Sequence, residues 1–130
     1  MDMEEYIEFW LKGAEHDLAA AEALYYSKNY DWSLFIGHLV LEKVLKALII
    51  QNTGEPMPPK MHNLSRLAIH AKLELSEEQT RFLIEANKFH IEARYPDYKN
   101  TFYKLCDQNY ASNQLNRIKE VYKCLKLMIK

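Results

Sequence analysis

The segment from Leu34 to Ile50 is apolar on almost every side of the helix it would form, and no other feature constrains the fold of this chain as strongly. A helix that lacks a polar face has to be covered by other elements of the protein. Four polar residues interrupt the segment, namely His38, Glu42, Lys43 and Lys46, so it cannot serve as a transmembrane span. The sequence therefore predicts a core helix and no membrane association.

Helical signals also flank this core helix. Apolar residues at three- and four-residue spacing predict an amphipathic helix over residues 4–27 and a last helix from about 112 to 128. Asp31 is in position to cap the core helix, which then extends to about residue 51. The break between the first two helices is short, so they should be antiparallel neighbours.

Proline divides the middle of the chain. Three of the four prolines fall within residues 52–60, which predicts a loop. A short helix is expected over residues 63–71. Ser76 and Gln79 then form the capping-box pattern that begins a fourth helix.

The end of that fourth helix and the overall fold follow from the remaining signals. Pro96 disfavours helical backbone at the residue before it, so the helix should end near residue 93 or 94. Residues 95–111 receive no assignment, and no strand-like alternation of useful length occurs. The sequence predicts an all-α fold: an antiparallel up-and-down bundle of about five helices, four long and one short, forming a single domain over residues 1–130.

Overall charge and cysteine content narrow the functional classes. The 17 basic and 18 acidic residues leave a formal net charge of −1. This balance argues against a duplex-DNA-binding protein whose affinity comes from neutralising many phosphates. Cys106 and Cys124 do not form a CxxC pair, and no basic-then-apolar leader is found. The expected location is therefore cytoplasmic, with reduced thiols.

A polar line crosses the core helix. His38, Glu42 and Lys46 follow one another at four-residue spacing and so share one side of the helix, with Lys43 beside them. In one interpretation Glu42 and Lys46 form an ordinary helix-surface ion pair. In the other interpretation the line is the floor of a ligand pocket, and the sequence leaves both open.

The second candidate site is the corner Arg94-Tyr95-Pro96-Asp97, where an arginine at a helix end precedes a turn fixed by proline. One interpretation is a corner that directs Arg94, Tyr95 and Asp97 at a ligand. The other is a helix-stop turn in which Arg94 covers the last carbonyls and Asp97 bonds within the turn. His62, just after the proline-rich loop, is either a helix-capping or a ligand-facing residue.

Metal and cofactor motifs are missing from the sequence. It contains no HExxH, no paired Cys/His spacing, no P-loop and no GxGxxG among its three glycines. His38 and Glu42 form an HxxxE pair that could supply two helix-borne ligands, but no convergent third ligand is evident. The sequence therefore predicts no metal site and no cofactor.

Four blocks of sequence, in this order and spacing, are specific enough to suggest a family. They are the first-helix residues Trp10, Ala14, Asp17 and Leu18, the block Leu41-Glu42-Lys43-Val44-Leu45-Lys46-Ala47-Leu48, the triplet His62-Asn63-Leu64 and the corner Arg94-Tyr95-Pro96-Asp97. Together they resemble the HEPN family, from about Glu4 to the last helix. The resemblance implies an up-and-down helical bundle, often a homodimer, with a nucleotide- or RNA-related role.

The resemblance also implies a partner and a ligand groove. Proteins of this type are frequently encoded beside a minimal nucleotidyltransferase, in two-component or toxin–antitoxin pairs. The family's suggested groove corresponds here to Glu42, Lys43, Lys46, Arg94 and His62. The polar line and the corner add His38, Tyr95 and Asp97 to the predicted ligand-binding set.

The ribonuclease signature of the family is absent. Many toxin members are metal-independent ribonucleases in which an arginine is followed, four to six residues later, by a histidine. After Arg94, positions 99–101 hold lysine, asparagine and threonine. The first hypothesis is therefore a non-catalytic module that binds a nucleotide or RNA-type phosphate ligand. Two alternatives stay open: a ribonuclease toxin whose catalytic groups come from Arg94, His62 and His90, and a structural interaction protein.

Overall fold

Six α-helices and no strands make up this chain. In the computed structural model, which describes residues 1–130, they are α1 (Met3–Tyr26), α2 (Tyr30–Thr53), α3 (Leu64–His70), α4 (Glu77–Glu92), α5 (Thr101–Leu105) and α6 (Gln108–Leu127). The predicted all-α fold is confirmed, and α1, α2, α4 and α6 are its four long helices. The unassigned residues 95–111 contain the five-residue helix α5 and the start of α6.

Side-chain caps set most of the helix starts. Ser76 and Gln79 exchange the capping-box hydrogen bonds before α4, as the sequence predicted. The predicted start of the last helix at residue 112 was wrong, because the Asp107 carboxylate accepts the Tyr110 N–H at 2.8 Å and α6 begins four residues earlier. The prediction that Asp31 caps α2 was also wrong. Asp31 lies inside the first turn, where its negative charge suits the helix dipole.

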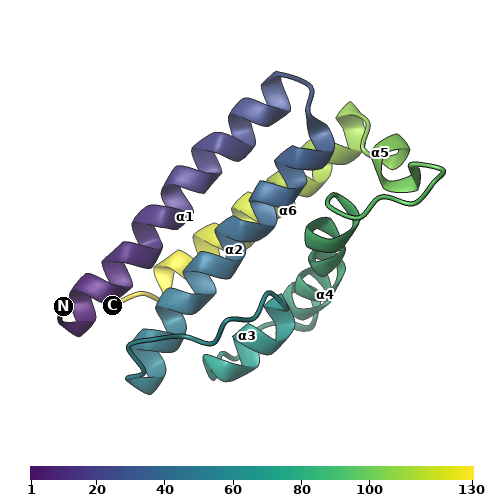
Figure 1. The fold of residues 1–130 in the computed structure, drawn as a ribbon. Coiled ribbons are helices and arrows are strands. Elements are labelled where there is room, and N and C mark those ends of the chain that lie inside the picture. Colours follow the sequence, from purple (N-terminus) through teal and green to yellow (C-terminus); the bar gives the residue numbers. More distant parts are fainter.

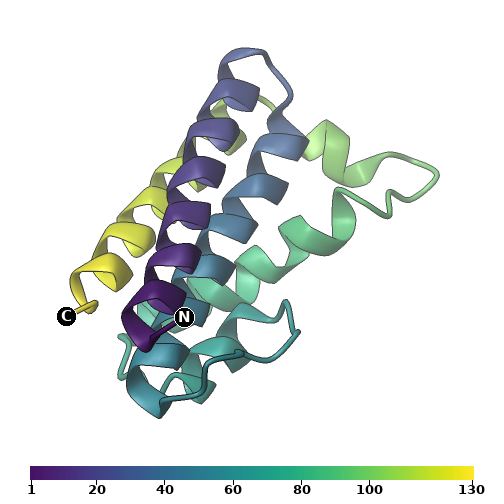
Figure 2. The ribbon, with the colours of Figure 1, turned by 60° about the vertical axis from the view of Figure 1, so that its left-hand side comes forward.

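The four long helices alternate in direction along the chain, which is the predicted up-and-down order (Figure 1). Helix α2 contacts each of the other five helices. Figure 2 shows α1, α2 and α6 side by side, with α4 leaning away from them toward α5. Both chain termini lie at the same end of the bundle (Figure 1).

The central position of α2 follows from its sequence. Between Val40 and Ile50 every residue except Lys43 is buried, so the predicted core helix is confirmed. Any polar side chain on the inner faces of α2 is consequently placed inside the protein rather than at its surface. No helix of the chain combines the length and the apolar character that crossing a membrane requires.

Candidate functional site

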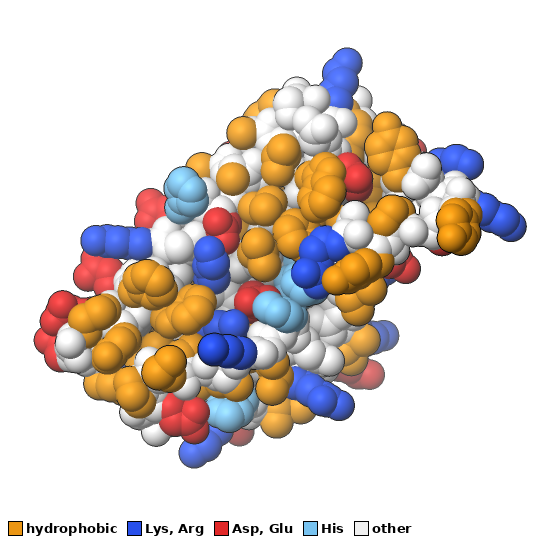
Figure 3. Space-filling model, viewed as in Figure 1, with side chains coloured by type: hydrophobic (Ala, Val, Ile, Leu, Met, Phe, Trp, Pro, Cys, Tyr) orange, Lys and Arg blue, Asp and Glu red, His pale blue; other side chains and the backbone are white.

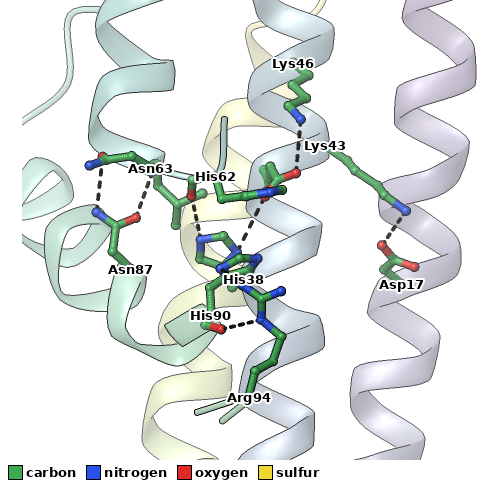
Figure 4. Close-up of polar contacts among 11 residues, drawn as sticks. Asp17, His38, Lys43, Lys46, His62, Asn63, Asn87, His90 and Arg94 are labelled. Carbon is green, nitrogen blue, oxygen red and sulfur yellow. Dashed lines mark hydrogen bonds and ion pairs between the residues drawn. The ribbon is translucent and has the colours of Figure 1, made fainter. Parts of the chain in front are cut away.

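The structure gathers six polar side chains along one face of α2, and we call this group the polar cluster. Helix α2 contributes His38, Glu42 and Lys46, which are 0%, 5% and 6% exposed. The loop before α3 adds His62, α4 adds His90, and the turn after α4 adds Arg94 (Figure 4). The interpretation of Glu42 and Lys46 as a helix-surface pair was therefore wrong, since both side chains are buried.

The Glu42 carboxylate is the centre of this cluster. Its Oε2 accepts a hydrogen bond from Lys46 Nζ at 3.1 Å, and its Oε1 accepts one from His62 Nδ1 at 2.9 Å. Burial raises the pKa of Glu42, but the hydrogen bond from His62 and the charge of Lys46 outweigh it, so the pKa lies below its usual value. Glu42 is therefore an anion at neutral pH that two donors hold in place.

His38 lies deepest in the cluster. Its Nε2 is 2.9 Å from the His62 carbonyl oxygen, and a carbonyl only accepts, so Nε2 carries the proton. Burial lowers the pKa of His38 to about 4, and the nearby Glu42 carboxylate only partly opposes that shift. The imidazole is therefore neutral at neutral pH. Its Nδ1 is an unprotonated, buried atom that no protein donor reaches.

The loop that carries His62 is tied to α4 by asparagine side chains. Asn63 caps α3 by accepting the Arg66 N–H, and Asn87 Nδ2 of α4 donates to Asn63 Oδ1 at 3.2 Å (Figure 4). Asn87 Oδ1 accepts the Leu64 N–H at 2.8 Å. Asn63, not His62, is thus the helix cap, and these bonds fix the backbone carbonyl that orients His38.

His90 joins α4 to the cluster. Its ring stacks on His62 with centroids 4.4 Å apart and lies 4.8 Å from the His38 ring. Burial lowers the pKa of His90, and the charge of Arg94 adds to the effect. Sequence reasoning did not pair His90 with the polar line, although a histidine on the otherwise apolar face of a predicted helix was a signal for it.

Arg94 is held in place without an acidic partner. Its Nε donates to the His90 carbonyl at 3.1 Å, and its Nη2 donates to His90 Nδ1 at 3.2 Å. The guanidinium also lies over the rings of Phe35 and Tyr95, 5.8 and 5.2 Å from their centroids. No carboxylate lies within ion-pairing distance of it. Since a guanidinium has five N–H donors, most of its donors stay free.

The other predicted site residues lie at the edges of the cluster or apart from it. Lys43 reaches across to α1, where its Nζ pairs with Asp17 Oδ2 at 2.7 Å. Tyr95 is exposed, and the Arg94 guanidinium lies over its ring. Asp97 faces its own turn, with its carboxylate accepting from the Thr101 N–H at 2.8 Å and from the Thr101 hydroxyl at 2.6 Å. The contacts fit the helix-stop interpretation for Asp97. They also fit it for Arg94, whose Nε donates to the His90 carbonyl in the last turn of α4.

An apolar cavity lies beside Lys46. The Lys46 ammonium is 5.2 Å from the centroid of the Trp10 ring, a cation–π contact that the sequence did not suggest. Next to this ring is a cavity of about 330 Å³. Its walls are Met1, Tyr6, Phe9, Trp10, Lys46, Pro56, Met57, Pro58 and Lys60.

The fold and the site define an all-helical protein with a buried polar cluster on its central helix. The model of the HEPN domain matches residues 7–128. The chain belongs to the HEPN family.

Two solved structures have similar folds. The archaeal HEPN homologue ST0689 is 25% identical, with a TM-score of 0.75 over 95% of this chain and 98% of that chain. The protein TT1696 from Thermus thermophilus is 18% identical, with a TM-score of 0.76 over 92% of this chain and 95% of that one, and at this identity it shows the fold alone. No curated protein sequence matches this chain.

Proposed function

We propose that the polar cluster binds a nucleotide or an RNA-type phosphate ligand. The observation that carries this proposal is Arg94, a guanidinium fixed by two hydrogen bonds to His90 yet paired with no acid. An arginine oriented in this way offers charge-assisted donors in the planar arrangement that suits phosphate oxygens. Holding the side chain before the ligand arrives also reduces the entropy lost on binding.

The surroundings of Arg94 support the same ligand class. The His62 side chain is 56% exposed and faces solvent beside it, and Tyr95 offers an aromatic face on which a base can stack. Trp10 offers a second aromatic face beside Lys46, at the other end of the cluster. The space-filling view shows Lys, Arg and His side chains around an acidic centre on this face of the molecule (Figure 3). A ribose hydroxyl could donate to the Glu42 carboxylate.

The proposal also covers the proteins with which this chain would associate. The family implies a homodimer that works with a minimal nucleotidyltransferase in a two-component or toxin–antitoxin pair. Exposed apolar side chains near the cavity, Phe9 and Met57 among them, provide surface that such a partner could cover.

Replacing Arg94 by alanine is expected to weaken ligand binding by about tenfold or more, since a hydrogen bond from a charged donor contributes roughly 1.5–3 kcal/mol. Calorimetric titration of the purified chain with nucleotides and short RNAs measures this effect. Arg81→Ala is the control, because Arg81 is an exposed arginine on α4. If the wild type bound none of these ligands, or if Arg94→Ala and Arg81→Ala bound them equally well, the proposal would be refuted. The polar cluster would then have a purely structural role.

One observation favours ribonuclease activity as a second candidate. The buried Glu42 carboxylate accepts the His62 Nδ1–H, which leaves His62 Nε2 to accept a proton at the surface. His90 links this pair to Arg94, because its ring stacks on His62 and accepts from the guanidinium. Such a group could take the proton of a 2′-hydroxyl while Arg94 stabilises the charge that develops on the phosphate.

The His62→Gln variant tests this candidate. The wild-type chain, incubated with a short RNA in a chelator, should cleave it to products ending in 2′,3′-cyclic phosphate, and His62→Gln should lose at least about a hundredfold in rate. His16→Gln, at an exposed position of α1, is the control. RNA that stays intact with the wild type excludes the ribonuclease and leaves the binding proposal standing.

A further inference from the structure

We propose that His38, Glu42 and His90 form a binding site for a divalent transition-metal ion such as Zn²⁺. The ligand atoms are His38 Nδ1, Glu42 Oε1 and a ring nitrogen of His90. The argument for this site does not rest on the phosphate-binding proposal, although both involve His90. The site differs from the sequence expectation because α4 supplies the third ligand that the HxxxE pair lacked.

The state of His38 is the first argument. Its only protein hydrogen bond is the one that Nε2–H donates to the His62 carbonyl, so the Nδ1 lone pair is left without a donor. This lone pair lies 3.9 Å from Glu42 Oε1. Glu42 Oε1 accepts one hydrogen bond, from His62, and no donor lies between it and the His38 lone pair. A cation between these two atoms would be attracted to both. Histidines that bind metals characteristically donate their other N–H to a backbone carbonyl in this manner.

The geometry of the three groups is the second argument. One ligand atom from each of His38, Glu42 and His90 lies within 4.8 Å of the other two. In a tetrahedral zinc site with bonds of about 2.0–2.2 Å, ligand atoms are roughly 3.3–3.6 Å apart. The 3.9 Å between His38 Nδ1 and Glu42 Oε1 is already close to that separation. The larger separations, which reach up to 4.8 Å, would have to shorten as the metal binds.

The ligand chemistry selects the ion. Two imidazoles and one carboxylate suit Zn²⁺, Co²⁺, Ni²⁺ or Cu²⁺, whereas Mg²⁺ and Ca²⁺ prefer all-oxygen sites. Glu42 would ligate through the second lone pair of Oε1, whose other lone pair accepts from His62 Nδ1, while Oε2 keeps its hydrogen bond to Lys46. Ligating carboxylates are commonly supported in this way by an outer donor. His62 stacks on His90 and is itself 56% exposed, so it lies between His90 and solvent.

Arg94 competes with a metal ion for His90, and this competition gives the proposal a prediction of its own. The guanidinium donates to His90 Nδ1, so a neutral His90 carries its proton on Nε2. A metal that binds either nitrogen of His90 therefore requires the Arg94 hydrogen bond to the ring to break. Arg94 and the metal ion compete for His90, and removing the guanidinium should strengthen metal binding while it weakens phosphate binding.

The test is a titration of the full chain, after treatment with a chelator, with Co²⁺ followed by visible absorption and with Zn²⁺ by calorimetry. One Co²⁺ per chain with the intense bands of a tetrahedral site is expected. His38→Gln and His90→Gln should each weaken binding by at least about tenfold, and Arg94→Ala should tighten it by about tenfold. His70→Gln is the matched control, because His70 forms the exposed histidine–carboxylate pair of the chain with Glu55.

The proposal would be overturned if the chain bound no metal ion, or if His70→Gln abolished metal binding and His38→Gln did not. A bound water would then be the partner of His38 Nδ1. Circular dichroism of each variant shows whether it folds. If His38→Gln does not fold, the opposite responses of His90→Gln and Arg94→Ala still decide. Running the nucleotide titrations in the presence of a chelator keeps failure of the metal site and failure of phosphate binding distinguishable.

Discussion

Replacing Lys46 by alanine is expected to lower the free energy of unfolding by about 3 kcal/mol. Lys46 is 6% exposed and donates to Glu42, which is itself 5% exposed. Without this ammonium the carboxylate stays buried with His62 as its remaining donor, and a buried charge that loses a partner costs more than the ion pair contributed. The variant also loses the contact of the lysine with Trp10. Urea unfolding followed by circular dichroism measures the change.

Two further variants show whether the unpaired carboxylate is the cause. Lys12→Ala removes a lysine of α1 that pairs with Glu8 four residues earlier, and both of these side chains are exposed, at 74% and 61%. It should cost about 0.5 kcal/mol or less. The double variant Lys46→Met/Glu42→Gln removes both charges at nearly constant volume and should recover most of the loss. Equal destabilisation by Lys46→Ala and Lys12→Ala would contradict the account.

The helices were predictable where local signals agreed. The capping box at Ser76 and Gln79 involves residues three apart, so the sequence alone contains the whole interaction. The start of α6 was misplaced because residues 108–111 carry weak apolar periodicity, while the deciding feature was the Asp107 carboxylate on the Tyr110 N–H. Local caps are therefore a better guide to helix starts in this chain than the onset of apolar spacing.

The polar cluster was predictable only along one helix. His38, Glu42 and Lys46 could be aligned from their four-residue spacing on α2, but that spacing does not tell whether the line is at the surface or inside. Its burial depends on how α4 packs against α2, and this packing brings in His90. Such contacts join residues far apart in sequence, so they cannot be predicted from the periodicity of a single helix.

The proposed ligand and metal place opposite demands on the same two residues. A phosphate ligand needs Arg94 held by His90, whereas a metal ion needs His90 released from Arg94. One variant, Arg94→Ala, is therefore expected to move the two affinities in opposite directions. If the polar cluster had only a structural role, Arg94→Ala would change the stability of the chain. It would not weaken phosphate binding and strengthen metal binding at the same time.

Gly37→Val is expected to destabilise the chain by about 3 kcal/mol through overpacking. Gly37 is buried on α2 where this helix meets α6, and a Cβ atom there would stand 2.6 Å from Ile118 Cδ1 and 3.7 Å from Ile118 Cγ2. Valine adds two further methyl groups to a contact that a single carbon already overfills. The helices would have to separate or Ile118 would have to leave its rotamer, and thermal and urea unfolding both report the loss.

The partner residue supplies the internal check. In the double variant Gly37→Val/Ile118→Ala, the shorter side chain at position 118 leaves space for the valine. The double variant should therefore lose less free energy of unfolding than the sum of the two single losses. Gly13→Ala is the control, because its added Cβ meets only the flexible Lys43 side chain, 3.1 Å away at Cδ. There the better helix propensity of alanine offsets the contact, and little change is expected. If Gly37→Val were as stable as Gly13→Ala, α2 and α6 could move apart without cost. Close packing between these two helices would then not be the reason for a glycine at position 37.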